Sequence, residues 1–185
     1  RDGFPGKAYY PSRLYPKFER IAADDPLEAV LAEADRHGMN VFVGVGNYAW
    51  FDFTADSLAW HKNVADELWR KYGHHQSFYG WYISAEIAGN LGTDDLRREE
   101  LVRFFEGFKE HAARLAPDKP VMLATNCHSI RDSNGYYPRL LAHLDILCPF
   151  GFHRMPAGDL TGEEAAAILQ EYCDEAGSHL WMDME

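Results

Sequence analysis

Apolar residues recur along this chain with two alternating periods. Short continuous apolar runs, typical of parallel strands covered on both faces, alternate with longer segments whose apolar positions repeat every three or four residues, as on one side of a helix. Strands are expected at residues 39–46, 78–86, 120–126, 145–152 and 179–185. Helices are expected at residues 26–37, 56–72, 94–115, 137–143 and 162–176. This alternation predicts an α/β fold with a parallel sheet.

Residues typical of helix caps mark the ends of the first and last of these helices. Asp25 is expected to be the N-cap of the first, with Glu28 completing a capping box, and Gly38 follows its last turn. Thr161 and Glu164 form the same box before the last helix. These local signals fix where the two helices begin.

Charge and composition exclude several classes of partner. The net charge is −11 and no basic block occurs, which argues against nucleic acid and anionic membranes. No apolar run approaches the roughly 20 residues of a membrane span. The odd number of cysteines, Cys127, Cys148 and Cys173, rules out complete pairing within the chain, and we expect all three to be buried small hydrophobic residues. The chain begins at Arg1, so the signal peptide of an exported protein would lie upstream.

Candidate chemistry begins at Glu86, where an aromatic strand ends. In α/β barrels the carboxyl ends of the strands carry the reacting groups. Side chains alternate along a strand, so Glu86 is expected to share one face with Ser84 and Tyr82. That polar face would line a barrel lumen or cleft while the apolar face packs on helices.

A second strand ends in the same way, at Glu185. Alternation places Glu185 on one face with Asp183 and Trp181. Paired carboxylates suit glycoside hydrolysis, in which one protonates the leaving oxygen and the other attacks or stabilises the anomeric carbon. The expected catalytic pair is therefore Glu86 and Glu185.

Aromatic and polar residues near the strand ends supply the expected substrate contacts. Aromatic residues make up 14% of the chain, enough for both a core and stacking surfaces for sugar rings. The expected substrate-binding residues are Asn47, Trp50, Tyr82, Asn126, His128, Trp181 and Asp183.

Other chemistries find weaker support. His74 and His75 are neighbours whose side chains are expected to diverge, and His61 lies on a helix; with no HExxH and no His-x-His on a strand, no metal site is expected. Lys119 precedes its strand, the wrong end for Schiff-base chemistry. Neither GxSxG nor a GxGxxG after a strand occurs, so no cofactor is expected.

Several segments together resemble a known family. Residues 79–83 leading to Glu86, preceded by 65–69 and 72–75, resemble a bacterial TIM-barrel family catalogued as a domain of unknown function and regarded as glycosidase-like. Residues 116–122, 144–147 and 181–185 are similar to later segments of that family. The likeness runs from about Tyr9 to the end of the chain.

That family in turn resembles clan A glycoside hydrolases, whose acid/base glutamate ends strand four and whose nucleophile ends strand seven. If residues 39–46 are strand three, Glu86 ends strand four and Glu185 ends strand seven. The resemblance implies a retaining glycosidase acting on an oligo- or polysaccharide. One departure is Ala85, which stands where the clan usually has an asparagine that binds the sugar 2-hydroxyl.

The same counting predicts a partial barrel. A (β/α)8 TIM barrel commonly takes about 250 residues, and strands one, two and eight are missing here. We expect residues 1–185 to form a single partial TIM-barrel domain, about strands 3 to 7 of a longer protein, and to be inactive alone. Two alternatives stay open: a catalytically inactive carbohydrate-binding barrel, which Ala85 favours, and a metal-dependent hydrolase. No feature specifies an oligomeric state.

Overall fold

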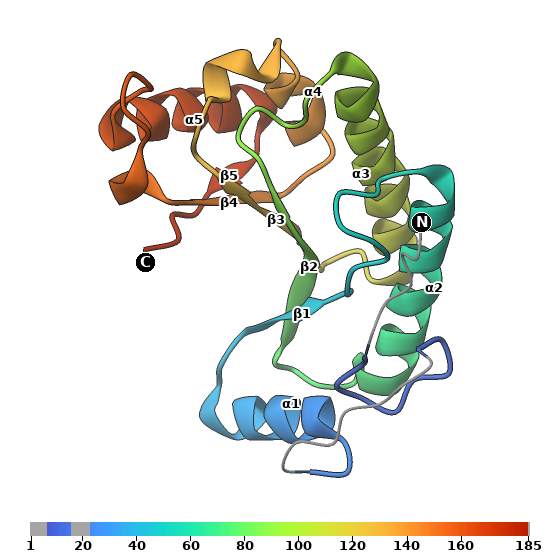
Figure 1. Cartoon of the computed structure of the whole chain (residues 1–185). Helices are drawn as coiled ribbons and strands as arrows, with labels where there is room; N and C mark the ends of the chain where they lie inside the picture. Colours follow the sequence, from blue (N-terminus) through green and yellow to red (C-terminus); the bar gives the residue numbers. More distant parts are fainter. Residues whose placement is uncertain (1–6, 16–22, 185) are drawn as a thin grey trace.

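A five-stranded parallel sheet forms the centre of the molecule (Figure 1). The structure is a computed structural model, and it describes residues 7–15 and 23–184. Within those residues the strands pair in sequence order as β1 (Val41–Gly44), β2 (Phe78–Ile87), β3 (Val121–Asn126), β4 (Ile146–Phe150) and β5 (His179–Leu180). Every adjacent pair is parallel. The predicted α/β fold with a parallel sheet is confirmed.

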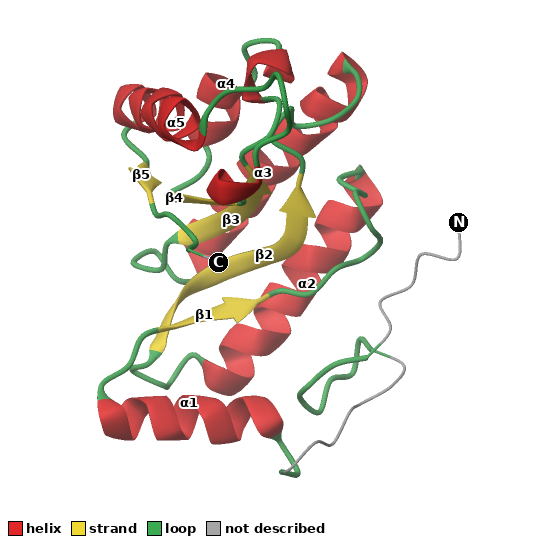
Figure 2. Cartoon of the chain, turned by 60° about the vertical axis from the view of Figure 1, so that its left-hand side comes forward, coloured by secondary structure: helices red, strands yellow, loops and turns green. Residues whose placement is uncertain are grey.

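Helices connect the strands. They are α1 (Pro26–His37), α2 (Ala55–Tyr72), α3 (Asp95–Leu115), α4 (Tyr137–Leu141) and α5 (Gly162–Ala176), with 3-10 turns at Ile130–Ser133 and Phe152–Arg154. α2 and α3 lie side by side along the sheet, and α1 lies across the end where β1 and β2 begin (Figure 2). The described helices are too short or too polar for any of them to cross a membrane.

All five strands differ from their predicted bounds; β3 begins one residue later, at Val121, and β4 is shorter at both ends, running from Ile146 to Phe150. β1 begins at Val41 because the Met39 N–H donates to Ala34 O at 2.9 Å and so belongs to the end of α1. β2 runs one residue past Glu86. β5 is the shortest, but the N–H groups of Trp181 and Asp183 still donate to Leu147 O and Pro149 O at 2.9 and 3.0 Å. The chain therefore stays extended beside β4 after the regular ladder ends.

The two predicted helix caps have different outcomes. The Asp25 side chain accepts a hydrogen bond from Glu28 N, as expected for an N-cap. However, the Glu28 carboxylate does not close a capping box, because it lies 3.0 Å from His75 Nε2 instead. The box of Thr161 and Glu164 is present in both directions. Both helices end at glycines with positive φ, Gly38 and Gly177, as predicted.

The core holds β2 in place. On its apolar face Trp81 and Ile83 are fully buried, and the Trp81 ring lies 6.1 Å from that of Trp69 in α2. From α3, Phe104 and Phe105 are also buried. Burying one such side chain contributes about 2 kcal/mol, so several together anchor the strand that carries Glu86.

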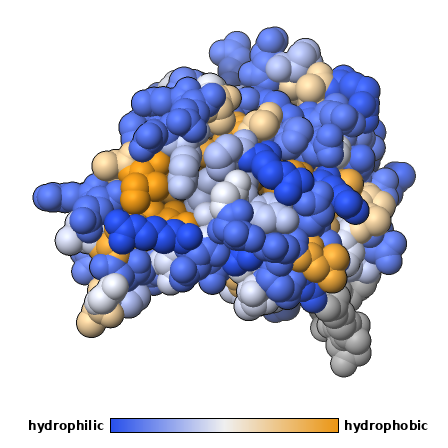
Figure 3. Space-filling model, turned by 90° about the horizontal axis from the view of Figure 1, so that it is seen from above, coloured by the Kyte–Doolittle hydropathy of each residue, from blue (hydrophilic) through white to orange (hydrophobic). Residues whose placement is uncertain are grey.

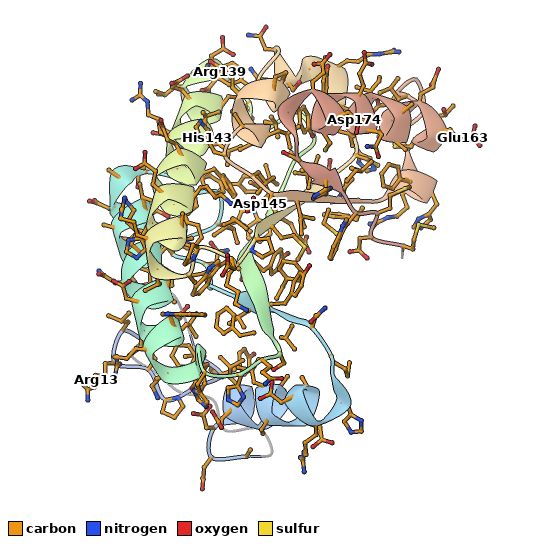
Figure 4. All side chains as sticks on the ribbon, turned by 180° about the vertical axis from the view of Figure 1, so that it is seen from behind. Arg13, Arg139, His143, Asp145, Glu163 and Asp174 are labelled. Atoms are coloured by element: carbon orange, nitrogen blue, oxygen red, sulfur yellow. The ribbon has the colours of Figure 1, made fainter. Side chains whose placement is uncertain are left out.

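Asp145 fastens α3 to the beginning of the sheet (Figure 4). Its carboxylate forms an ion pair with Lys109 of α3 and accepts a hydrogen bond from Val121 N at 2.7 Å. The amino ends of β3 and β4 are thereby tied to the last turns of that helix.

The sheet is strongly curved. The aromatic rings of Phe42 in β1 and Trp181 after β5 lie 5.6 Å apart, in edge contact, although β1 and β5 stand at opposite ends of the strand order. A flat sheet of this size would hold its outer strands about 19 Å apart at the usual strand spacing. One face of the sheet is therefore concave.

Candidate active site

Glu86 lies on the open face of β2. Burial alternates along the strand, with Trp81, Ile83 and Ala85 buried while Tyr82 is half-buried and Glu86 is exposed. The predicted division into a helix-facing apolar set and an open polar set therefore holds for this strand.

The strand bulges where it carries Glu86. Ile83 pairs with Leu123, but Ile87 pairs with Thr125, so four steps along β2 match two along β3. Bulges of this kind occur next to active sites, where they redirect a side chain. On the side of β2 away from β3, the Ser84 hydroxyl accepts a hydrogen bond from Gly46 N at 3.2 Å. This bond ties the bulge to the segment after β1.

Tyr82 is influenced by charged groups from neighbouring segments of the sheet. Burial raises the pKa of its phenol, and the charges of Glu86, Cys148 and Asp183 raise it further. The four groups come from β2, β4 and the extended segment after β5. A phenol is protonated at neutral pH, and the raised pKa keeps it so over a wider pH range, so Tyr82 can donate a hydrogen bond to a carboxylate.

Cys148 differs from the expectation that all three cysteines are buried. It is half-buried rather than buried, and the pKa of its thiol is raised by burial and by the Asp183 charge. The alternation of side chains along β4 could have indicated this exposure. Cys148 pairs with Ala124 of β3, and two positions later Phe150 pairs with Asn126. The other cysteines, Cys127 and Cys173, are buried as expected.

The second predicted catalytic residue, Glu185, lies outside the described residues. Asp183, which alternation places on the same face, is exposed and is held beside β4 through its N–H bond to Pro149 O. Besides Glu86, Asp183 is the described carboxylate whose charge raises the pKa of Tyr82.

Asn126 joins the two loops that follow β2 and β3. Its Oδ1 accepts hydrogen bonds from Gly89 N at 2.8 Å and from His128 N at 3.0 Å. A Cβ at position 89 would lie 2.2 Å from His128 O, so only glycine allows the two loops to approach this closely. The side-chain carbonyl of Asn126 therefore holds these two loops in position at the carboxyl ends of β2 and β3.

Arg98 also links the loops that follow β2 and β3, and the sequence analysis did not predict this role. It is 8% exposed, and its guanidinium donates to Asn90 O at 3.0 Å and to Asp132 O at 2.7 Å. It also pairs with Asp95 at 2.8 Å. An arginine in the first turn of a helix ordinarily indicates a solvated charge, so its sequence position gave no sign of this role.

A cavity of about 580 Å³ opens between the loops that follow β1 and β2. Trp50, 66% exposed, lines it together with Phe51, Leu91 and Arg97. Phe51 and Leu91 have φ of 55° and 62°, a left-handed conformation that costs non-glycine residues roughly 1–3 kcal/mol and is concentrated at functional sites. Ile87, the residue after Glu86, also lines the cavity.

The remaining predicted contacts are dispersed. His128 is half-buried with Nε2 lacking a hydrogen-bond partner within the described part of the chain, and a Cβ at Gly151 would lie 3.4 Å from it. Asn47 is half-buried in the loop after β1. Trp181 lines a separate cavity of about 370 Å³ with Tyr79 and other residues from the amino ends of the strands. Trp181 is therefore separated from the cavity at Trp50.

The histidines differ from expectation in one respect. His61 is buried in α2 with Nδ1 2.7 Å from Ser57 O, and burial lowers its pKa, as suits a neutral structural histidine. The rings of His74 and His75 do not diverge, since their centroids are 4.2 Å apart with 36° between the planes. That prediction was wrong because the turn after α2 points both rings the same way.

Solved structures with a similar fold are described as glycosidases. One, described as a "putative alpha-L-fucosidase" from Bacteroides thetaiotaomicron VPI-5482, has a TM-score of 0.73 at 17% identity over 98% of this chain and 60% of that one. Another, a GH2 beta-galacturonidase from Eisenbergiella tayi bound to galacturonate, has a TM-score of 0.52 at 16% identity over 89% of this chain and 28% of that one. At these identities the likeness shows the α/β fold. The chain spans about 60% of the length of the first of these proteins.

Sequence relationships place the chain in a family. No curated protein matches it. Its residues 1–185 match the family described as "Domain of unknown function (DUF4434)", in agreement with the resemblance found in the sequence. With the match extending over its whole length, the chain belongs to this DUF4434 family.

Proposed function

We propose that the protein is a retaining glycoside hydrolase in which Glu86 is the general acid/base. The observation that carries the proposal is the environment of Tyr82, whose phenol is influenced by the carboxylates of Glu86 on β2 and of Asp183 in the extended segment after β5. Glycoside hydrolysis requires a pair of carboxyl groups, and α/β barrels carry such groups at the carboxyl ends of their parallel strands.

The proposed nucleophile is Glu185, two residues beyond Asp183 and on the same face by alternation. In retaining enzymes the two carboxyl groups stand about 5–5.5 Å apart, against roughly 6.5–9.5 Å in inverting ones. Glu86 would protonate the leaving oxygen, Glu185 would form the glycosyl–enzyme bond, and Glu86 would then activate water. The protonated phenol of Tyr82 would hydrogen-bond the carboxylate that is charged at each stage.

We further propose that the sheet is part of a (β/α)8 barrel, covering about strands 3 to 7. Parallel strands in sequence order and the contact of Phe42 with Trp181 across the concave face support this closure.

An oligo- or polysaccharide is the proposed substrate. Trp50, exposed on the rim of the 580 Å³ cavity, offers a stacking surface for a sugar ring. Asn47, Asn126, His128 and Asp183 are the proposed hydroxyl contacts near the same strand ends. Trp181 is proposed as an apolar contact on the concave face, nearer the amino ends of the strands.

The test is a panel of aryl glycosides and polysaccharides assayed with the full-length protein. Glu86→Gln should lower kcat by about 10²–10⁴-fold on substrates with poor leaving groups, with a smaller effect on activated aryl glycosides that need no proton. Glu185→Gln should remove turnover on both kinds of substrate. Glu106→Gln, on the exposed side of α3, is the matched control and should leave kcat unchanged.

A second candidate function is carbohydrate binding without catalysis. Ala85 favours it, because this side chain is 6% exposed on the helix-facing side and contributes no polar group where the related clan has asparagine. Sugar binding by the wild-type protein with no turnover of any substrate, and no change in binding in Glu86→Gln, would select this function.

A further inference from the structure

Three potential metal ligands meet at the end of the sheet remote from Glu86. Glu28 lies in the first turn of α1, while His74 and His75 form the turn between α2 and β2. One ligand atom from each lies within 4.8 Å of the other two. We propose that these three side chains bind a divalent transition-metal ion, with Zn²⁺ as the best match to two imidazoles and one carboxylate.

His75 is oriented as a ligand. Its Nδ1 lies 2.7 Å from an Asp35 carboxylate oxygen, and the other oxygen of Asp35 accepts from Ser77 N at 2.6 Å. Metal-binding histidines commonly donate their second ring N–H to a carboxylate held in this way, which fixes the tautomer and the ring orientation. With the Nδ1 proton held by Asp35, loss of the Nε2 proton to an incoming ion leaves a lone pair directed toward Glu28, whose Oε2 lies 3.0 Å from Nε2.

The spacing suits insertion of an ion. Zinc bonds of about 2.0–2.2 Å to nitrogen and oxygen place two tetrahedral ligand atoms about 3.3 Å apart. His75 Nε2 and Glu28 Oε2, at 3.0 Å, need to separate by only a few tenths of an ångström. On binding, the ion replaces any proton that these two atoms share, and that proton passes to solvent.

His74 would supply the third bond. Its exposed ring lies 4.2 Å from the buried ring of His75, so it can rotate without disturbing the core and gives an ion access from solvent. The ion would link α1 to the turn before β2, at the amino end of the sheet. We therefore assign it a stabilising role separate from the proposed glycosidase chemistry.

The experiment uses full-length protein freed of metal with a chelator and titrated with Zn²⁺ by calorimetry, and with Co²⁺ by absorption. We expect one ion per chain, Co²⁺ bands typical of tetrahedral coordination, and a rise in Tm of about 5–10 °C at zinc concentrations near 100 times Kd. Glycosidase turnover should not depend on the metal.

The variants separate a metal site from a simple ion pair. His74→Ala removes an exposed side chain, so the fold should persist by circular dichroism while zinc affinity falls at least tenfold. Asp35→Asn should weaken affinity by about 10–100-fold through the orientation of His75. His153→Ala, which removes another exposed histidine, is the control and should bind zinc like the wild-type protein. Absence of binding at millimolar zinc, or equal affinity in His74→Ala and wild type, would overturn the proposal.

Discussion

At the scale of single residues, Tyr82 connects the candidate catalytic groups. Its ring is half-buried on β2, and burial together with the charges of Glu86, Cys148 and Asp183 raises the pKa of its hydroxyl. The hydroxyl can donate a hydrogen bond to a carboxylate, while the ring contributes packing. Replacing tyrosine by phenylalanine separates the two contributions.

Tyr82→Phe should therefore lower kcat while the fold remains intact. Loss of one hydrogen bond to a charged group corresponds to about 1.5–3 kcal/mol, or roughly 10–100-fold in kcat. Steady-state kinetics on an aryl glycoside and thermal melting of the full-length protein provide the measurements. Tyr79→Phe is the matched control, since Tyr79 packs against Phe42 with 5.2 Å between ring centroids, at the other end of the strand. Equal kcat values for Tyr82→Phe and wild type would remove Tyr82 from the mechanism.

At the scale of elements, the loops after β2 and β3 are held as one unit. Arg98 contacts a carbonyl in each, and Asn126 accepts from an N–H in each. Glu86 lies directly before the first of these loops. Its position consequently depends on a buried arginine as well as on the strand.

Arg98→Ala would leave Asn90 O and Asp132 O without their donor, at a cost of about 2–3 kcal/mol in the free energy of unfolding. Urea denaturation should show this loss, and limited proteolysis should cut residues 88–94 and 127–134 faster. Arg98→Lys should recover only part of the stability, because an ammonium cannot reach two carbonyls with a planar fork. Arg103→Ala is the control: Arg103 is 74% exposed, so the change should stay within about 0.5 kcal/mol. A neutral Arg98→Ala would show that the loops are held by other contacts.

The same elements show which features a sequence can predict. The succession of strands and helices along the chain, the helix starts and the open face of β2 follow from local periodicity and capping. These predictions agree with the structure. The contacts of Arg98 and the exposure of Cys148 depend on residues far away in the chain. Tertiary contacts of this kind leave no local period to detect.

At the scale of the whole molecule, acidity has two opposing effects on stability. The face seen from above is mostly hydrophilic with separate apolar patches (Figure 3), and the chain carries a net charge of −11. Mild acidification reduces the self-repulsion of that charge, which favours the folded state. Against this, several folded carboxyl groups have lowered pKa values, and protonating them favours unfolding. Asp159, whose pKa is lowered by hydrogen bonds from Ser129 N and Leu160 N, is one of them, and Asp95, beside Asn134 and Arg98, is another.

The sign of the second effect follows from the direction of the shifts. Because the folded pKa of Asp159 is below the unfolded value of about 3.9, its contribution to stability is complete above that pH and is lost as pH falls through the folded pKa. Tm should thus hold or rise slightly from pH 7 to about 5 and fall below about 4. Asp159→Asn, whose single amide oxygen is a weaker acceptor for two N–H groups, should lower Tm at pH 7, and its difference from wild type should shrink toward pH 3. Asp118→Asn, in an exposed turn, should follow the wild-type curve throughout. A difference between Asp159→Asn and wild type that stays constant from pH 7 to 3 would mean that the carboxylate charge contributes nothing to holding the loops around residues 129 and 160.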